Sequence, residues 1–165
     1  MKSIRLIVNL ILVFFLFGSS VAYSQEFYRL KNNFTYEYMH IENKQGHVEL
    51  TSKLLAGGMW SSQWSMVPVA NNFVRLKNRW TGDYMHTENK KGIVELSKRL
   101  ISGGMWSAQW KIIPMKDNSV QLQNRWTGDN MYIDITNQAG VVKVAKTKTL
   151  TDIMWSDQWV LEKVQ

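Results

Sequence analysis

The sequence predicts an all-β protein with the β-trefoil fold, built from three repeats of about 46 residues. Residues 27–64 and 73–110 match without a gap at an offset of 46, and 24 of these 38 positions are identical. A third copy begins at Val120 and closes with Met-Trp-Ser-Asp-Gln-Trp at residues 154–159. Self-similarity at a fixed period is the signature of a repeat architecture. We therefore divide the domain into repeats 27–72, 73–119 and 120–165.

Each repeat is expected to contain four short strands separated by turns. In the second repeat the strands are expected at residues 73–76, 84–88, 93–96 and 109–113. Residues 79–83 have turn composition, and Gly92 closes a tight hairpin turn that favours a positive φ. Three units are too few for a propeller, and the ends show no caps for an open solenoid. A six-stranded barrel capped by three hairpins remains, which leaves no exposed sheet edge.

The first 24 residues have the composition of a secretory signal peptide. Lys2 and Arg5 precede an apolar run over residues 6–17, and small side chains lead to Ser24. The run is too short to span a bilayer, so we expect cleavage rather than membrane insertion. The domain at residues 25–165 is then exported to the periplasm or the medium.

Composition narrows the function classes. The chain has no cysteine, so a disulfide framework is excluded and the fold depends on its own apolar core. The formal net charge is +7, and the charges are interspersed rather than clustered. This pattern, together with export, argues against a nucleic-acid partner.

The repeat motifs resemble those of the ricin-type β-trefoil lectin family. The second repeat reads Asn-Arg-Trp-Thr-Gly at 78–82, Tyr-Met-His at 84–86, Val-Glu-Leu at 94–96 and Gln-Trp at 109–110. The strings Asn-Arg-Trp-Thr-Gly-Asp and Met-Trp-Ser-x-Gln-Trp also resemble trefoil carbohydrate-binding modules of bacterial polysaccharide-degrading enzymes. The resemblance covers the whole domain and implies a trefoil that binds sugar.

This sequence departs from the family pattern at the implied sugar pocket. The closing Gln stands directly before Trp, where the family places it two residues before. The family's pocket Asp aligns with His40, His86 and Tyr132. The family's stacking aromatic aligns with Thr51, Ser97 and Ala145, and its late-loop Asn with Ser61, Ser107 and Ser156. The pocket has therefore been either rebuilt or lost.

Repeated polar residues are the first candidates for a rebuilt pocket. Each His is followed two residues later by a carboxylate that would share its strand face, and the next strand supplies another. The candidate sugar-binding sets are His40, Glu42 and Glu49 in the first repeat, His86, Glu88 and Glu95 in the second, and Tyr132 with Asp134 in the third. The alternative interpretation is a salt-bridged surface patch.

Repeated aromatic residues are the second group of candidates. Trp60, Trp106 and Trp155 follow loops and would serve either as stacking faces for a sugar or as a lid over the barrel end. Trp80 and Trp126 lie in turns, where they would contact ligand or plug the packing. By contrast, the tryptophans that begin an apolar strand are assigned to the core: Trp64, Trp110 and Trp159.

Other repeated polar residues are expected to be structural. We interpret the following as groups that cap turns by hydrogen-bonding the backbone: Asn32, Asn78, Asn124, Thr35, Thr81 and Thr127. His47 has no counterpart in the other repeats and is expected to be a solvated turn residue.

The sequence thus predicts a non-catalytic, multivalent protein that binds a glycan or polysaccharide. An active site in near-identical triplicate is not expected, and no compact metal-ligand motif, nucleophile motif or cofactor motif occurs. One alternative is a secreted protein-binding trefoil, such as a protease inhibitor. Another is a structural module that acts as the accessory partner of a separate enzyme.

Overall fold

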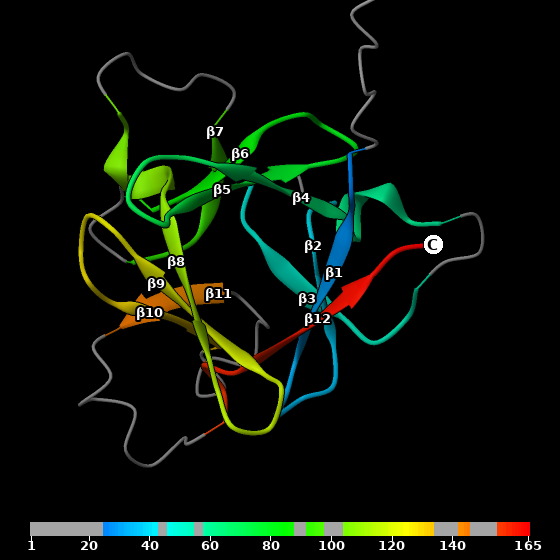
Figure 1. Ribbon diagram of the computed structural model, residues 1–165. Coiled ribbons are helices and arrows are strands. Elements are labelled where there is room, and N and C mark those ends of the chain that lie inside the picture. The colour runs from blue at the N-terminus through cyan, green and yellow to red at the C-terminus, as the bar shows by residue number, and fades with distance from the viewer. Residues whose placement is uncertain are drawn as a thin grey trace, which may run out of the picture.

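The computed structural model is an all-β structure in which three similar units surround one barrel (Figure 1). It describes residues 25–42, 46–54, 58–87, 92–97, 104–133, 142–145 and 155–165. The predicted signal peptide and the candidates Glu88 and Asp134 lie outside the described residues.

Twelve strands and two short 3₁₀ turns make up the described secondary structure. The strands of the first repeat are β1 (Tyr28–Asn32), β2 (Tyr38–His40), β3 (Glu49–Thr51) and β4 (Trp64–Pro68). Those of the second are β5 (Val74–Asn78), β6 (Tyr84–His86), β7 (Glu95–Ser97) and β8 (Trp110–Pro114). Those of the third are β9 (Val120–Asn124), β10 (Asn130–Ile133), β11 (Val142–Ala145) and β12 (Trp159–Lys163). The 3₁₀ turns are η1 (Trp60–Ser62) and η2 (Trp106–Ala108).

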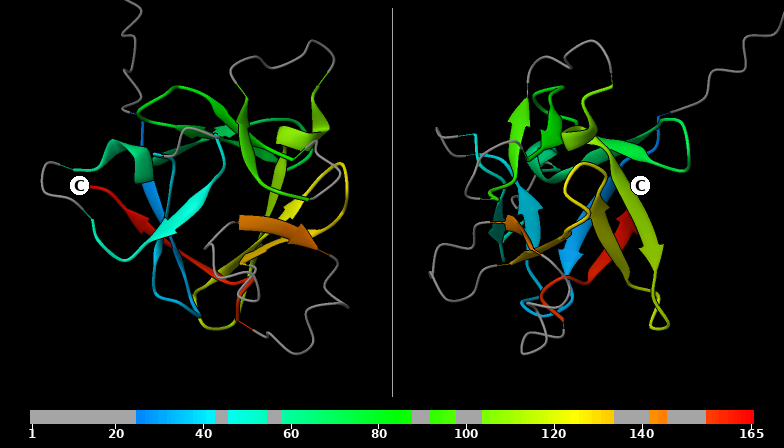
Figure 2. Two further views of the ribbon diagram at one scale, coloured as in Figure 1. Left: turned by 180° about the vertical axis from the view of Figure 1, so that it is seen from behind. Right: turned by 90° about the vertical axis from the view of Figure 1, so that its left-hand side faces the viewer.

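The first and fourth strands of every repeat close a six-stranded antiparallel barrel. The pairs run β1–β4, β4–β5, β5–β8, β8–β9, β9–β12 and β12–β1, which completes a ring. The second and third strands of each repeat form the hairpins β2–β3, β6–β7 and β10–β11. Figure 2 shows these hairpins gathered at one end of the barrel. This arrangement is the β-trefoil that the repeats predict.

Three valines tie the hairpins together at that end. Val48 N–H donates to Val94 O at 2.9 Å, Val94 N–H to Val142 O at 2.9 Å, and Val142 N–H to Val48 O at 3.1 Å. All three side chains are fully buried. The ring of hydrogen bonds satisfies backbone groups that burial would otherwise leave unpaired.

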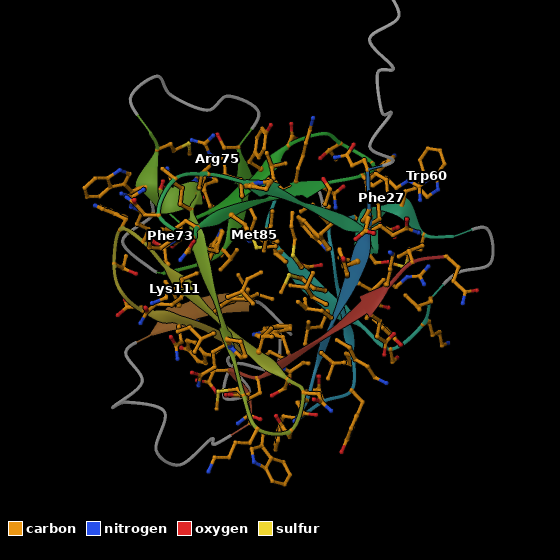
Figure 3. All side chains as sticks on the ribbon, viewed as in Figure 1. Phe27, Trp60, Phe73, Arg75, Met85 and Lys111 are labelled. Carbon is orange, nitrogen blue, oxygen red and sulfur yellow. The ribbon has the colours of Figure 1, made fainter. Side chains whose placement is uncertain are left out.

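The core consists of triplets of equivalent residues from the three repeats. Besides the valines, these are Leu30, Leu76 and Leu122; Met39, Met85 and Met131; and Trp64, Trp110 and Trp159. Each of these nine side chains is 0% exposed, and Figure 3 shows Met85 directed into the interior. The assignment of the strand-leading tryptophans to the core is confirmed.

The core tryptophans also satisfy polar groups inside the barrel. Trp110 Nε1–H donates to Met85 O at 3.1 Å, and equivalent bonds run from Trp64 to Met39 O and from Trp159 to Met131 O. Each indole therefore holds its barrel strand to the hairpin strand of its own repeat.

Three buried asparagines bind each repeat to the one before it. Asn78 Nδ2 donates to Ser61 O at 2.8 Å, while its Oδ1 accepts the backbone N–H groups of Trp80 and Thr81 at 3.1 and 3.2 Å. Asn124 and Asn32 make the same contacts with Ser107 O and Ser156 O. The predicted capping role is confirmed, and these side chains also join neighbouring repeats.

Trp110→Ala should lower the free energy of unfolding by about 3–5 kcal/mol, because it leaves a large cavity and an unpaired Met85 carbonyl. Urea denaturation of the variant and of Trp80→Ala measures this. Trp80 is 59% exposed, so its removal should change the free energy by about 0.5 kcal/mol or less. Equal losses in the two variants would contradict the core assignment.

Candidate functional site

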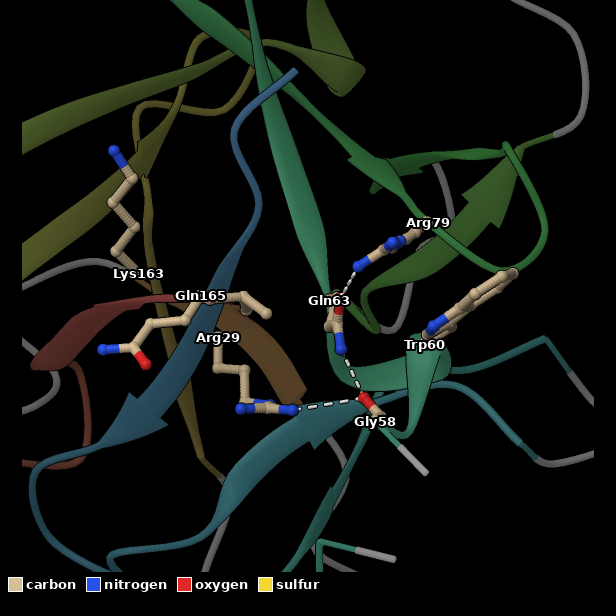
Figure 4. A pocket seen from close by; sticks show the side chains of 8 residues that line it. Arg29, Gly58, Trp60, Gln63, Arg79, Lys163 and Gln165 are labelled. Atoms are coloured by element: carbon tan, nitrogen blue, oxygen red, sulfur yellow. Dashed lines mark hydrogen bonds between the residues drawn. The ribbon is translucent and has the colours of Figure 1, made fainter. Parts of the chain in front are cut away.

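A surface cavity of about 510 Å³ lies where the first repeat meets its neighbours. Its walls come from Arg29 on β1, Trp60 and Gln63 at the η1 turn, Arg79 after β5, and residues 163–165 at the end of β12 and just beyond it. Figure 4 shows Arg29 and Gln63 directed at the Gly58 carbonyl. Trp60 is 53% exposed at the rim, so an aromatic face stands beside a polar cavity.

Gly58 and Trp60 shape this cavity. Gly58 has a φ of +99°, a conformation that favours glycine because it lacks Cβ. Its carbonyl accepts hydrogen bonds from Arg29 Nη2 at 3.1 Å and from Gln63 Nε2. A Cβ built on Gly58 would lie 3.6 Å from Cδ1 of Trp60, so the edge of the indole packs on the glycine. The backbone of Gly58 thus positions both the Trp60 ring and the Arg29 guanidinium.

Arg79, from the second repeat, supports Trp60, from the first. Its guanidinium carbon lies 4.8 Å from the centre of the Trp60 ring and 4.4 Å from that of Phe27. Arg79 Nη1 donates to Gln63 Oε1 at 2.6 Å. Figure 3 shows Phe27 and Trp60 side by side at the edge of the molecule. Cation–π contacts of this kind favour a fixed ring orientation.

The second repeat repeats this arrangement. Arg125 lies 4.6 Å from the Trp106 ring centre and 4.9 Å from that of Phe73, and its Nη1 donates to Gln109 Oε1 at 2.7 Å. Arg75 Nη2 and Gln109 Nε2 both donate to the carbonyl of Gly104, which has a φ of +110°. Two near-identical polar and aromatic sites therefore face solvent.

The third repeat has a cavity at the equivalent place, with different chemistry. It measures about 360 Å³ and is lined by residues 114–117, Trp155 and Gln158. Asn33 stands where the other sites have arginine, and its Nδ2 donates to Asp117 Oδ2 at 3.2 Å and Gln158 Oε1 at 3.3 Å. Trp155 is 55% exposed, so the aromatic face is retained without the stacked cation.

The polar candidates that the structure describes lie on or next to the hairpins, and none of them lines either cavity. His40 faces Glu49 across β2–β3, His86 faces Glu95 across β6–β7, and Tyr132 faces Lys143 across β10–β11. β2 ends at His40, so Glu42 lies beyond the strand instead of on its shared face.

Two carboxylates among these candidates have partners within the protein. Glu42 Oε1 accepts a hydrogen bond from Ser61 Oγ at 2.7 Å. Glu95 Oε1 lies 3.3 Å from His47 Nε2. The expectation that His47 is a solvated turn residue is wrong, because it is half-buried and pairs with the next repeat. His40 Nδ1 is buried and has no hydrogen-bond partner among the described residues.

The turn aromatics form a separate exposed set. Trp80 and Trp126 are 59% and 56% exposed, and Phe34 occupies the matching turn of the first repeat. Their backbone N–H groups are held by the buried asparagines, which turns the rings outward. Their role as ligand contacts stays a prediction.

Sequence reasoning missed the arginines and phenylalanines that surround Trp60 and Trp106. Arg29 and Arg75 precede buried leucines on barrel strands, and Arg79 and Arg125 stand in the Asn-Arg-Trp-Thr-Gly turns. The signal available was their repetition: Phe27, Phe73, Arg29 and Arg75 recur at the repeat offset. The contacts of Arg79 and Arg125 with a tryptophan of the preceding repeat depend on the closed barrel.

Within the described ranges, His, Asp and Glu side chains nowhere gather in a group of three suited to a metal ion. No stretch of helix in those ranges has the length and apolar character that crossing a membrane requires.

Comparison with known proteins places the chain among β-trefoils of varied function. No protein-family model matches the sequence, and no curated protein does either. The structure is similar to a GlcNAcα1-4Gal-releasing endo-β-galactosidase from Clostridium perfringens, with a TM-score of 0.71 and 26% identity over 85% of this chain. The chain spans only 33% of that enzyme's length.

Two further neighbours are small trefoils of about this size. The designed three-fold symmetric protein ThreeFoil has a TM-score of 0.65 and 19% identity, over 84% of this chain and 99% of its own. SeviL, solved with the asialo-GM1 saccharide, has a TM-score of 0.64 and 10% identity, over 86% of this chain and 100% of its own. The β-trefoil fold is thus supported independently of the repeats.

The third repeat should respond to pH through Asp157. This residue is 4% exposed, and burial raises the pKa of its carboxyl, although Asn130 and Gln121 donate hydrogen bonds to it. The folded state then binds the proton more tightly than the unfolded state. The stability from Asp157 is therefore present below its unfolded pKa, near 3.8, and lost as pH rises through the raised folded pKa.

The free energy of unfolding of wild type relative to Asp157→Asn should accordingly fall as the pH is raised from about 4 towards neutral. Asp117→Asn is the control of opposite sign, because hydrogen bonds from the Ser119 hydroxyl and backbone lower the pKa of Asp117. Wild type should gain relative to that variant as pH rises. Urea denaturation across the range measures both, and a flat Asp157 profile would contradict the burial argument.

Proposed function

We propose that this protein is a secreted, non-catalytic trefoil of the ricin-lectin type that binds carbohydrate at more than one site. The observation that carries the proposal is a pair of equivalent sites in which Trp60 and Trp106 stand half-exposed against an arginine of the next repeat. The site at Trp60 lines a polar cavity. Residues 1–24, with the composition of a signal peptide, support export to the periplasm or the medium. The glycan-related neighbours SeviL and the endo-β-galactosidase point in the same direction.

The chemistry of each site matches what a pyranose offers. One side of a sugar ring carries C–H groups that pack on an indole, and its edge carries hydroxyls that need donors and acceptors. Trp60 supplies the face, and the guanidinium groups of Arg29 and Arg79 supply donors to the same cavity. The aromatic that the family places after its third strand is absent here. The loop tryptophan would take over its role from another wall.

The affinity of each single site should be weak, and the presence of two equivalent sites should raise the overall affinity for a repeating glycan. An open surface site buries little area, and the hydroxyls it desolvates offset much of the interaction. Two sites on one rigid barrel bind a polymer with an avidity well above that of either alone. We therefore expect polysaccharides or dense glycan surfaces to be preferred over free monosaccharides.

The test is a glycan-array and insoluble-polysaccharide binding screen of residues 25–165. Trp60→Ala with Trp106→Ala should reduce binding of the captured glycan by at least about tenfold, since each stacking face contributes about 1 kcal/mol or more. Both rings are exposed, so the double variant should fold, and thermal unfolding checks this.

The matched comparison is Trp80→Ala with Trp126→Ala, which removes two rings of equal exposure from the turns. If this variant binds as wild type does, the sugar is assigned to the Trp60 and Trp106 sites. If only this variant loses binding, the sugar is assigned to the turn residues Trp80 and Trp126 instead. If wild type bound no glycan, the lectin proposal would fall and a protein partner would be sought.

A further inference from the structure

The sites around Trp60 and Trp106 in the first two repeats are rich in arginine. Each contains two arginines: Arg29 and Arg79 in one, Arg75 and Arg125 in the other. Among the described residues, no carboxylate lies within 4.0 Å of these guanidinium nitrogens, whereas Lys163 is paired with Glu26. The partners of the four arginines are neutral carbonyl and amide oxygens and aromatic rings.

Part of this donor capacity is unused. Arg29 Nε and Arg75 Nε are buried, and neither has a hydrogen-bond partner in the described structure. Arg79 and Arg125 each donate a hydrogen bond from Nη1 to a glutamine, while Trp and Phe rings cover the faces of their guanidinium groups. Stacking therefore holds each guanidinium in place with the rest of its N–H edge left for a ligand.

The third cavity serves as an internal contrast. Gln121 occupies the place of Arg29 and Arg75, and Asn33 that of Arg79 and Arg125. Two carboxylates are present as well: Asp117 lines the cavity, and Asp157 accepts a hydrogen bond from Gln121. The positions that hold two arginines in the first two repeats thus hold two neutral amides in the third, where Lys116, the one cation among the described residues that line the cavity, stands next to Asp117.

We propose that the sites around Trp60 and Trp106 bind saccharides that carry an anionic group, a carboxylate or a sulfate, and that the cavity of the third repeat does not. This inference rests on the proposed function and names the class of glycan. The indole would contact the sugar ring while the paired arginines receive the anionic group. A guanidinium suits a carboxylate or a sulfate because its N–H fork donates two parallel hydrogen bonds.

The test compares polymers that differ only in charge. Polygalacturonate is paired with its fully methyl-esterified form, and dextran sulfate with dextran, so that the two pairs separate carboxylate from sulfate recognition. Wild type should bind at least one charged polymer about tenfold or more tightly than its neutral partner at 0.15 M salt, where long-range attraction is screened. Affinity electrophoresis gives the ratios.

The third repeat suggests which substitution to make in the first two. Arg29→Gln with Arg75→Gln copies Gln121 of the third repeat and should bring the charged-to-neutral ratio close to one. Lys53→Gln with Lys111→Gln removes the same charge from exposed positions outside the described cavity walls and should leave the ratio within about twofold of wild type.

The outcomes separate this inference from the proposed function. Binding of charged and neutral polymers with equal affinity would overturn the anionic preference and leave carbohydrate binding standing. An equal drop in both double variants would also overturn it, because the preference would then come from net charge alone. Absence of binding to all four polymers and to the glycan screen would overturn both.

Discussion

The buried asparagine at the start of each turn is the contact on which the rest of the structure depends. Asn78 binds the carbonyl of Ser61 in the preceding repeat and caps its own turn through two backbone N–H groups. Each bond is worth about 1 kcal/mol, and an unpaired buried amide would cost more. Because Asn124 and Asn32 do the same, three identical contacts set every repeat against the next and close the barrel.

The candidate sites follow from this closure. The asparagine brings the residue after it, Arg79, against the η1 turn that carries Trp60 and Gln63. Two tryptophans four residues apart therefore differ in burial: Trp60 lies at the surface, while Trp64 is packed in the core. The site is therefore shared between repeats, and its chemistry depends on which residue each neighbour contributes. That dependence explains how Asn33 changes the third cavity without changing the fold.

The repeats were enough to predict the fold. Their offset, the turn residues around Gly82 and Gly92, and the strand-leading Trp64 and Trp110 all act within one repeat, where sequence spacing reports geometry directly. The sites around Trp60 and Trp106 were harder to predict because Arg79 meets Trp60 only across a repeat boundary. For the same reason His47 was misjudged: its partner, Glu95, belongs to the next repeat's hairpin.

The most direct test of the account is to observe the indole N–H resonances of the protein by NMR while an anionic oligosaccharide, tri-galacturonate, is added. The Trp60 and Trp106 resonances should shift together as the sites fill, while those of the buried Trp64, Trp110 and Trp159 stay fixed. Shifts confined to Trp155, or to the turn residues Trp80 and Trp126, would contradict the claim that sugar binds where Trp60 and Trp106 meet an arginine of the following repeat.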